Sequence, residues 1–365
     1  MGKLRRLPPL DPKSVERLSS LIFGGGVSDK TRELMAGQVG GNCVLVTGAG
    51  GSIGGQLCRR LAQLEPSQVV MVDISENGLY ETHKSVGFDG RFVPLMGDVR
   101  HSAKMEALFS SYYPDLVVHA AALKQVPMLE NPHNLVEAVR TNVHGTAEVA
   151  YYADKAGAKF VLVSTDKAVN PSSILGLTKR IAELVVAMNF RHQQHSIVRF
   201  GNVMNSNGSA IPLFREQIAN GGPVTITDCS MTRYMMTMGQ AVDLILASFA
   251  VPPMLHVLDM GNPIRILDLA HMLIRMADKE PLEDVGIEQI GMRPGEKLYE
   301  ELFYADELAD VEEHVDGIKS TTLPWRPEAA VPLRQLTCSA IDCTRTQEVQ
   351  EQLRAVVPDY QGEWR

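Results

Sequence analysis

A strand that runs directly into a glycine-rich turn and a helix is the feature that most constrains this chain. Residues 42–54 read NCVLVTGAGGSIG, and a helix is predicted over residues 56–64. Glycines at this spacing let the chain turn tightly and let its backbone approach a pyrophosphate, whose charge then lies at the helix N-terminus. The segment predicts a dinucleotide-binding unit with contacts from Gly48, Gly50, Gly51, Ser52, Ile53 and Gly54.

The next predicted strand, 69–73, ends in a carboxylate that indicates which dinucleotide binds. Asp73 follows the glycines by about 20 residues, the position that grips an adenosine ribose. This carboxylate would repel a 2′-phosphate, which favours NAD. Arg100 could neutralise such a phosphate, so NADP stays open.

Two further strand ends are expected at the cofactor. Residues 93–100, VPLMGDVR, predict a strand that brings Asp98 and Val99 to an adenine. Residues 115–122, DLVVHAAA, predict a strand that closes on small side chains, where a flat ring can approach the backbone. The alternative is tight helix–sheet packing, but the place of this strand in the series favours cofactor contacts from Ala120, Ala121 and Ala122.

Two polar residues follow these strands. Lys124 is either a solvated loop lysine or a substrate contact, and we expect the contact. Asn142 lies in a helix predicted over residues 135–156, among apolar and small residues. A mid-helix asparagine is often exposed, but this one could line the crevice, and we expect it at the cofactor.

Residues 161–180, VLVSTDKAVNPSSILGLTKR, carry the predicted chemistry. Residues 161–163 predict a buried parallel strand, so Thr165, Asp166 and Lys167 follow at the ligand crevice of an open α/β sheet. A helix that begins near residue 173 would place Leu175 and Lys179 on one face. The structural alternative is a strand, a polar turn and a helix with a solvated lysine.

The alternation of strands and helices predicts how the chain divides. Residues 41–205 predict a Rossmann-type, doubly wound parallel sheet, and residues 206–305 mainly a smaller mixed α/β lobe that covers the substrate. Residues 1–40 and 306–365 are expected as extensions. Planar guanidinium groups match phosphate oxygens, so we expect the diphosphate of a ligand at Arg199, Arg233 and Arg293.

Composition excludes several classes of protein. A net charge of -8 and a pI near 5.7 argue against nucleic-acid binding. Five cysteines without a CxxC pair fit a reducing compartment, and Cys338 and Cys343 lack nearby histidines, so we expect no metal site. No run of about 18 apolar residues and no signal peptide is found. We therefore predict a soluble cytoplasmic protein that binds no membrane.

Six motifs together resemble the extended short-chain dehydrogenases/reductases of the polysaccharide-biosynthesis branch, including UDP-N-acetylglucosamine 4,6-dehydratases. The similarity runs from about residue 42 to 303. The motifs are TGAGGSIG (47–54), HAAALK (119–124), STDKAVNP (164–171), VRFGNV (198–203), MTRY (231–234) and RPGEK (293–297).

The resemblance implies a reaction cycle on a nucleotide sugar. C4 is oxidised by the nicotinamide, water is eliminated across C5 and C6, and the hydride returns to C6, so the cofactor is tightly bound and recycled. Lys167 would take the C5 proton and Asp166 would protonate the leaving hydroxyl, and a closed, poorly solvated site is expected to favour the neutral forms of both. Asn202 and Glu296, in matched motifs, are expected among the substrate contacts, and a homo-oligomer is expected.

One position departs from the general short-chain pattern. Leu175 stands where the wider superfamily has a tyrosine that deprotonates the reacting hydroxyl, and some members of this branch have methionine there. Thr165 or a water that relays to Lys179 would then accept the C4 hydroxyl proton. Because Leu175 and Gln125 differ from the usual residues, two alternatives stay open, an epimerase or oxidoreductase on another nucleotide or nucleotide sugar, and a non-catalytic dinucleotide-binding module.

Overall fold

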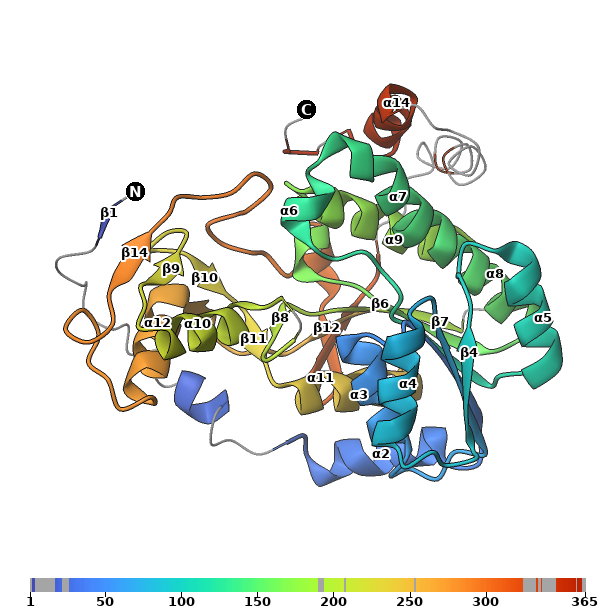
Figure 1. Cartoon of the computed structure of the whole chain (residues 1–365). Coiled ribbons are helices and arrows are strands. Elements are labelled where there is room, and N and C mark those ends of the chain that lie inside the picture. Colours follow the sequence, from blue (N-terminus) through green and yellow to red (C-terminus); the bar gives the residue numbers. More distant parts are fainter. Residues whose placement is uncertain are drawn as a thin grey trace.

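The computed structural model is built around a sheet with nine strands among the described residues (Figure 1). The structure describes residues 2–3, 17–21, 26–189, 194–206, 208–252, 254–323, 333, 336, 346–358 and 360–362. The run from β12 to β4 is parallel, and β16 and β15 extend it antiparallel. The doubly wound fold is confirmed. In spatial order the strands are β15 (Glu312–Val315), β16 (Ile318–Thr321), β12 (Leu255–Leu258), β7 (His195–Arg199), β6 (Lys159–Val163), β5 (Leu116–His119), β2 (Cys43–Thr47), β3 (Gln68–Asp73) and β4 (Phe92–Met96).

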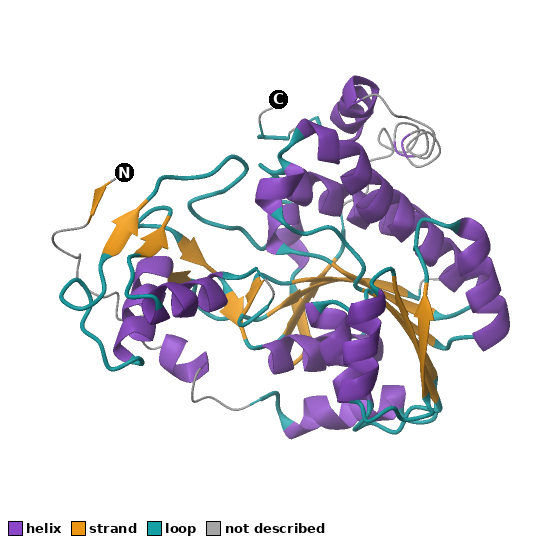
Figure 2. Ribbon diagram, viewed as in Figure 1, coloured by secondary structure: helices purple, strands orange, loops and turns teal. Residues whose placement is uncertain are grey.

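Helices cover both faces of this sheet, as Figure 2 shows. Val44 and Val46 of β2 pack into one apolar cluster and Leu45 into another on the opposite face, so the strand is apolar throughout. One face carries α2 (Asp29–Val39), α3 (Ser52–Leu61), α4 (Glu76–Ser85) and α11 (Met238–Ala247), and the other carries α5 (Ser102–Tyr112), α8 (Gly145–Ala156) and α9 (Ile174–Asn189). Beside α9 lie α6 (Val126–Leu129), α7 (Leu135–Val139) and α14 (Thr346–Val356).

A smaller lobe with its own apolar core lies beside the main sheet. Phe214, Leu267 and Ile287 are buried in that core. The helices are α10 (Ala210–Ala219) and α12 (Ile266–Arg275), and the strands pair as β1 (Gly2–Lys3) with β14 (Ile287–Gln289), β14 with β9 (Val224–Ile226), β10 (Thr232–Arg233) with β13 (Ile264–Arg265), and β8 (Asn202–Val203) with β11 (Met235–Met236).

The chain after residue 205 does not stay in the lobe, which differs from the division expected there. Helix α11 packs against α2 and α3, and β12 pairs with β7 in the main sheet. The pair β15 and β16 also extends that sheet, so residues 312–321 are not an appendage. The apolar sequence of β12 does not by itself indicate which sheet this strand joins. Among the described residues, no helix combines the length and the apolar character needed to cross a membrane.

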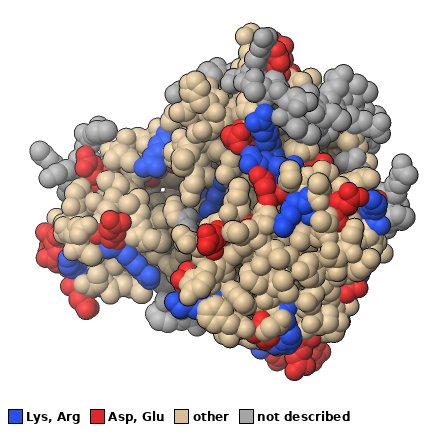
Figure 3. Space-filling view, turned by 45° about the vertical axis from the view of Figure 1, so that its right-hand side comes forward, with Lys and Arg blue, Asp and Glu red and all other residues tan. Residues whose placement is uncertain are grey.

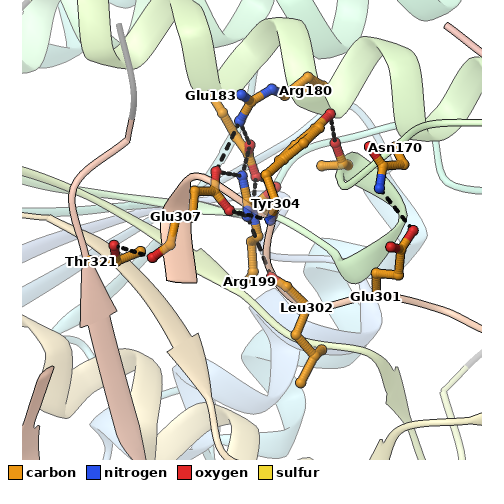
Figure 4. Close-up of polar contacts among 11 residues, drawn as sticks. Asn170, Arg180, Glu183, Arg199, Glu301, Leu302, Tyr304, Glu307 and Thr321 are labelled. Carbon is orange, nitrogen blue, oxygen red and sulfur yellow. Dashed lines mark hydrogen bonds and ion pairs between the residues drawn. The ribbon is translucent and has the colours of Figure 1, made fainter. Parts of the chain in front are cut away.

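A buried network of four charges connects β6, β7, α9 and the segment before β15 (Figure 4). The guanidinium of Arg199 donates to both Glu183 oxygens at 2.7 Å and to Oε2 of Glu307 at 2.6 Å. Arg180 lies 3.2 Å from Glu183 and 3.4 Å from Glu307, and Ser164 donates to Glu183 at 2.6 Å. Two arginines and two carboxylates thus compensate one another away from water.

The expected contact between Arg199 and a ligand diphosphate is wrong. The side chain of Arg199 is fully buried, and its guanidinium is bound by Glu183, Glu307 and the carbonyl of Leu302. The Glu183 carboxylate would favour its neutral form on burial, but the Arg199 and Arg180 charges outweigh that effect and lower the pKa of Glu183. Arg199 therefore acts in folding and reaches no ligand.

Removing one charge from this network should destabilise the fold strongly. We expect Glu307→Gln to lower the free energy of unfolding by about 3–5 kcal/mol, because it leaves two buried arginines with one carboxylate. Glu312→Gln is the matched control, since that carboxylate is 67% exposed and pairs only with His314 among the described contacts. It should change the free energy by less than about 0.5 kcal/mol. Urea denaturation of both variants tests this, and equal effects would contradict it.

Candidate functional site

The glycine-rich loop between β2 and α3 is a cradle that side chains would fill. Gly48 has φ 70°, and a Cβ there would lie 2.7 Å from the backbone of Ala120 and Ala121. A Cβ at Gly50 would lie 2.8 Å from the backbone of Gly78. The close approach of these backbones leaves amide groups at the start of α3, the environment that suits a pyrophosphate.

Asp73 lies at the carboxyl end of β3, beside this loop. Its Oδ2 accepts from Gly50 N at 2.9 Å and its Oδ1 from Ser75 N at 2.8 Å. A cavity of about 390 Å³ opens here, and part of the predicted set of cofactor contacts lines it. Its lining includes Gly48, Gly50, Gly51, Asp73, Asp98, Val99, Ala120, Ala121 and Ala122, but not Ser52, Ile53, Gly54, Asn142 or Lys179.

Arg100 also lines this cavity, but carboxylates already hold its charge. Its guanidinium donates to both Asp98 oxygens at 2.7 to 2.9 Å and to Oε2 of Glu137 at 2.6 Å. Hydrogen bonds from Arg100 lower the pKa of Asp98. A 2′-phosphate would have to compete with two carboxylates for Arg100.

Asn142 lies in an irregular turn rather than in one continuous helix. The predicted helix 135–156 is divided into α7 and α8 by a π-helical turn, Arg140–His144. The amide of Asn142 accepts from Leu123 N at 2.8 Å and donates to the Leu123 carbonyl and to Thr178, both at 3.0 Å. The wider turn lets this side chain tie the loop after β5 to α9.

Thr165, Asp166 and Lys167 meet where β6 ends, as predicted from the strand. A 3-10 turn, Asp166–Ala168, bends the chain, so adjacent side chains turn toward each other. Oδ1 of Asp166 accepts from Lys167 Nζ and from Thr165 Oγ1, both at 3.0 Å. Gly201 packs against Asp166, since a Cβ there would lie 2.8 Å from Oδ2.

Sequence reasoning missed Glu300, a second carboxylate at this centre. Its Oε1 lies 3.4 Å from Lys167 Nζ and 3.8 Å from Nε of Arg233. Asn202, predicted as a substrate contact, also accepts from Lys167 Nζ at 3.4 Å. Glu300 is far from residue 167 in the chain and lies outside the RPGEK motif, so no local pattern indicated it.

The expectation that a closed site would favour neutral Lys167 needs correction. Burial alone lowers the pKa of Lys167, but the carboxylates of Asp166 and Glu300 outweigh it, and the pKa is raised above its usual value. The described contacts therefore hold an ammonium group at this position.

Lys179 lies in a different environment on α9. It is buried, and desolvation lowers its pKa to about 8, although Glu183 acts in the opposite direction. Leu175, one turn earlier, is buried in an apolar cluster that also contains Leu129 and Ile174. Of the two lysines, Lys179 is thus the one that is readily deprotonated near neutral pH.

The segment 293–307 runs along the reactive stretch as a strap. Lys297 Nζ donates to the Val169 carbonyl at 2.8 Å, and Tyr304 Oη donates to the Ala168 carbonyl at 3.1 Å. Arg233 donates to the carbonyl of Thr232 and to the carbonyls of Lys297 and Leu298 in the strap. The described hydrogen bonds of Arg233 therefore all go to the backbone, two of them to the strap. Arg293 is exposed, and Oε2 of Glu296 accepts from the Arg293 amide at 2.9 Å.

A second cavity, of about 910 Å³, lies between the lobe and the main body. Residues of α3 and α4 line it on one side and residues of α10 and α12 on the other, and Gly50, Gly51 and Ser52 belong to its wall. Figure 3 shows a hollow between the two parts of the molecule, with both basic and acidic side chains around it. In the described part of the chain, Asp166, Lys167 and Lys124 line neither this cavity nor the one at Asp73.

Comparison with known proteins agrees with this geometry. The family model described as polysaccharide biosynthesis protein matches residues 44–321. The chain is 46% identical over 286 residues to the capsular polysaccharide biosynthesis protein CapD of Staphylococcus aureus, covering 75% of this chain and 47% of CapD. It is 33% identical over 288 residues to a UDP-glucose 4-epimerase of Rickettsia canadensis, covering 74% of this chain and 80% of the epimerase. The chain thus spans about half the length of CapD and of the similar EpsC of Bacillus subtilis.

Solved structures share the fold. Pen from Bacillus thuringiensis superimposes with a TM-score of 0.70 at 32% identity, over 78% of this chain and 90% of Pen. DesIV of Streptomyces venezuelae, a dTDP-glucose 4,6-dehydratase solved with NAD and TYD, superimposes with a TM-score of 0.64 at 20% identity, over 82% and 97% of the two chains. The resemblance predicted from the motifs is confirmed, and the chain belongs to the polysaccharide biosynthesis protein family of short-chain dehydrogenase/reductase fold.

Proposed function

We propose that this protein is a nucleotide-sugar 4,6-dehydratase that acts on UDP-N-acetylglucosamine. The observation that carries the proposal is the contact between Asp166 and Lys167, 3.0 Å apart at the carboxyl end of β6. An adjacent acid and base are what an elimination needs and what a simple hydride transfer does not need. Similarity to a capsular polysaccharide biosynthesis protein supports a nucleotide sugar as substrate.

The cofactor cradle fits a nicotinamide dinucleotide, which when bound supplies the hydride chemistry, accepting hydride from C4 of the sugar and returning it to C6. The C4 hydroxyl must also lose a proton. Lys179, with a pKa lowered to about 8, can hold that proton after a relay through Thr165 or water. Leu175 occupies the usual tyrosine position, so the proposed relay uses no tyrosine there.

The Asp166–Lys167 pair can perform the elimination with a balanced proton count. Transfer of one proton from Nζ to Oδ1, along the 3.0 Å hydrogen bond, converts the ion pair into a neutral amine and a carboxylic acid. Lys167 then takes the C5 proton that the C4 ketone acidifies, the C6–O bond breaks, and Asp166 gives its proton to the departing hydroxyl, which leaves as water. After hydride has added at C6, C5 regains a proton from Lys167. The pair then takes up one proton from solvent, and Lys179 releases to solvent the proton that came from the C4 hydroxyl, so the cycle closes.

The alternative is an epimerase or oxidoreductase on another nucleotide sugar. The 33% identity to a UDP-glucose 4-epimerase favours it. An epimerase returns hydride to C4 and eliminates no water, so the two reactions differ in mass and in the position that exchanges with solvent. Dehydration in deuterated water places deuterium at C5, and 4-epimerisation leaves C5 unlabelled.

The proposed reaction predicts a 4-keto-6-deoxy product from UDP-N-acetylglucosamine. Mass spectrometry should show the loss of one water, with solvent deuterium at C5. Lys167→Met should lower kcat by about 10³-fold, because it removes the general base. Lys155→Met is the control, since that lysine is 59% exposed on α8 and should be dispensable. A product that is only an epimer, or full activity of the Lys167 variant, would contradict the proposal.

We infer that NAD is the bound and recycled cofactor. Purified protein should carry it, so that heat denaturation releases NAD in excess over NADP, measured by liquid chromatography. Asp73→Asn should shift the ratio toward NADP by about tenfold, because the charge that repels a 2′-phosphate is gone. Asp89→Asn, which removes a carboxylate that pairs with Arg91 instead, should leave the ratio unchanged. Equal ratios in wild type and the Asp73 variant would contradict the role of Asp73.

A further inference from the structure

Lys167 is surrounded by as many oxygen atoms as an ammonium group has hydrogens. Nζ donates to Asp166 Oδ1 at 3.0 Å and to Asn202 Oδ1 at 3.4 Å, and Oε1 of Glu300 lies at 3.4 Å. An ammonium group offers three donors and no acceptor, whereas a neutral amine has two hydrogens and a lone pair. The described arrangement therefore suits the charged form and leaves no direction for a lone pair.

Of these three partners, Glu300 alone comes from the strap. Asp166 is the neighbour of Lys167 in the chain, and Asn202 belongs to β8. Glu300 belongs to the strap, which the buried ion pair between Glu307 and Arg199 anchors. Its carboxylate therefore comes from a different element than Asp166 and Asn202. A shift of the strap would remove Glu300 from Lys167 and leave Asp166 in place.

The carboxylate of Glu300 is also incompletely bonded. Its side chain is 3% exposed, and Oε2 has no hydrogen-bond partner among the described residues. Oδ2 of Asp166 is likewise buried without a described partner. Buried carboxylate oxygens without donors destabilise a fold, so this arrangement lowers stability.

We propose that Glu300 is a positioning residue of the reaction site, which holds Lys167 in its charged form, and that Lys167 becomes a base only when this contact is released. This deepens the proposed function and rests on it for the role of Lys167. The other charged groups around the pair are Arg233 on β10, 3.8 Å from Glu300, and Lys297 on the strap. Tyr234 faces Asp166 and Asn202 is neutral.

Removing the Glu300 charge has a defined consequence for Lys167. An opposite charge within about 4–6 Å shifts a pKa by about 1–3 units toward the charged form. Without Glu300, Asp166 is the one carboxylate paired with Lys167 among the described contacts, and the nearby charge of Arg233 disfavours an ammonium there. The neutral amine of Lys167 should therefore form at lower pH in a Glu300→Gln variant.

The test measures Lys167 directly and needs no substrate. Trace acetic anhydride labels neutral amines, so the labelling rate of Lys167 against pH, followed by peptide mass spectrometry on the full chain, reports its titration. We expect the midpoint to fall by about one pH unit in Glu300→Gln, about tenfold more neutral amine at a given pH. Glu301→Gln is the matched control, because that neighbouring strap carboxylate is 54% exposed and pairs with Lys297. Its midpoint should equal that of wild type.

An unchanged midpoint in Glu300→Gln would overturn the inference. Where that variant fails to fold by circular dichroism, Glu300→Asp, which withdraws the charge by one methylene, should give a smaller shift in the same direction, and no shift would again overturn it. In the dehydration assay, the basic limb of the kcat profile, where the Asp166–Lys167 pair loses its shared proton, should move down with the midpoint. An absent 4-keto-6-deoxy product with a shifted midpoint would refute the proposed function alone.

Discussion

The burial of Arg199 is the constraint on which the site depends. A guanidinium that lies out of water must keep its carboxylates, so β7, α9 and the segment at Glu307 are forced to meet at one point. Ser164, which lies between β6 and the reactive residues, donates to the same Glu183. The network thus sets the end of β6, the helix that carries Lys179, and the anchored end of the strap relative to one another.

Two lysines within this frame lie in opposite electrostatic environments. Lys179 is desolvated near the carboxylate of Glu183, which Arg199 and Arg180 already neutralise, and its pKa falls to about 8. Lys167 lies against two carboxylates, and its pKa rises. Under the proposed function the two lysines have different roles. Lys179 accepts a proton near neutral pH, whereas Lys167 must first give its proton to Asp166.

Local patterns predicted the parts of the site that depend on neighbours in the chain. The glycine cradle, the carboxylate at the end of β3 and the reactive residues after β6 each follow from a strand and the turn behind it. Arg199 and Glu300 could not be assigned in this way, because their partners are distant in the chain. The carboxylates that bind Arg199 lie 16 and 108 residues away, and Lys167 lies 133 residues from Glu300. The sequence around an arginine does not indicate whether its partner is a carboxylate or a phosphate. The return of β12 to the main sheet was missed for the same reason.

Leu175 shows how packing bears on chemistry at a position where the motif changed. Its side chain is 6% exposed and belongs to an apolar cluster that also contains Val349 and Leu353 of α14. A tyrosine at this position would bring a hydroxyl into that cluster, where it would need a hydrogen-bond partner. An apolar residue satisfies the packing of α9 but supplies no proton acceptor. Under the proposed function the acceptor must therefore come from the same helix one turn on, where burial has already brought Lys179 close to its neutral form.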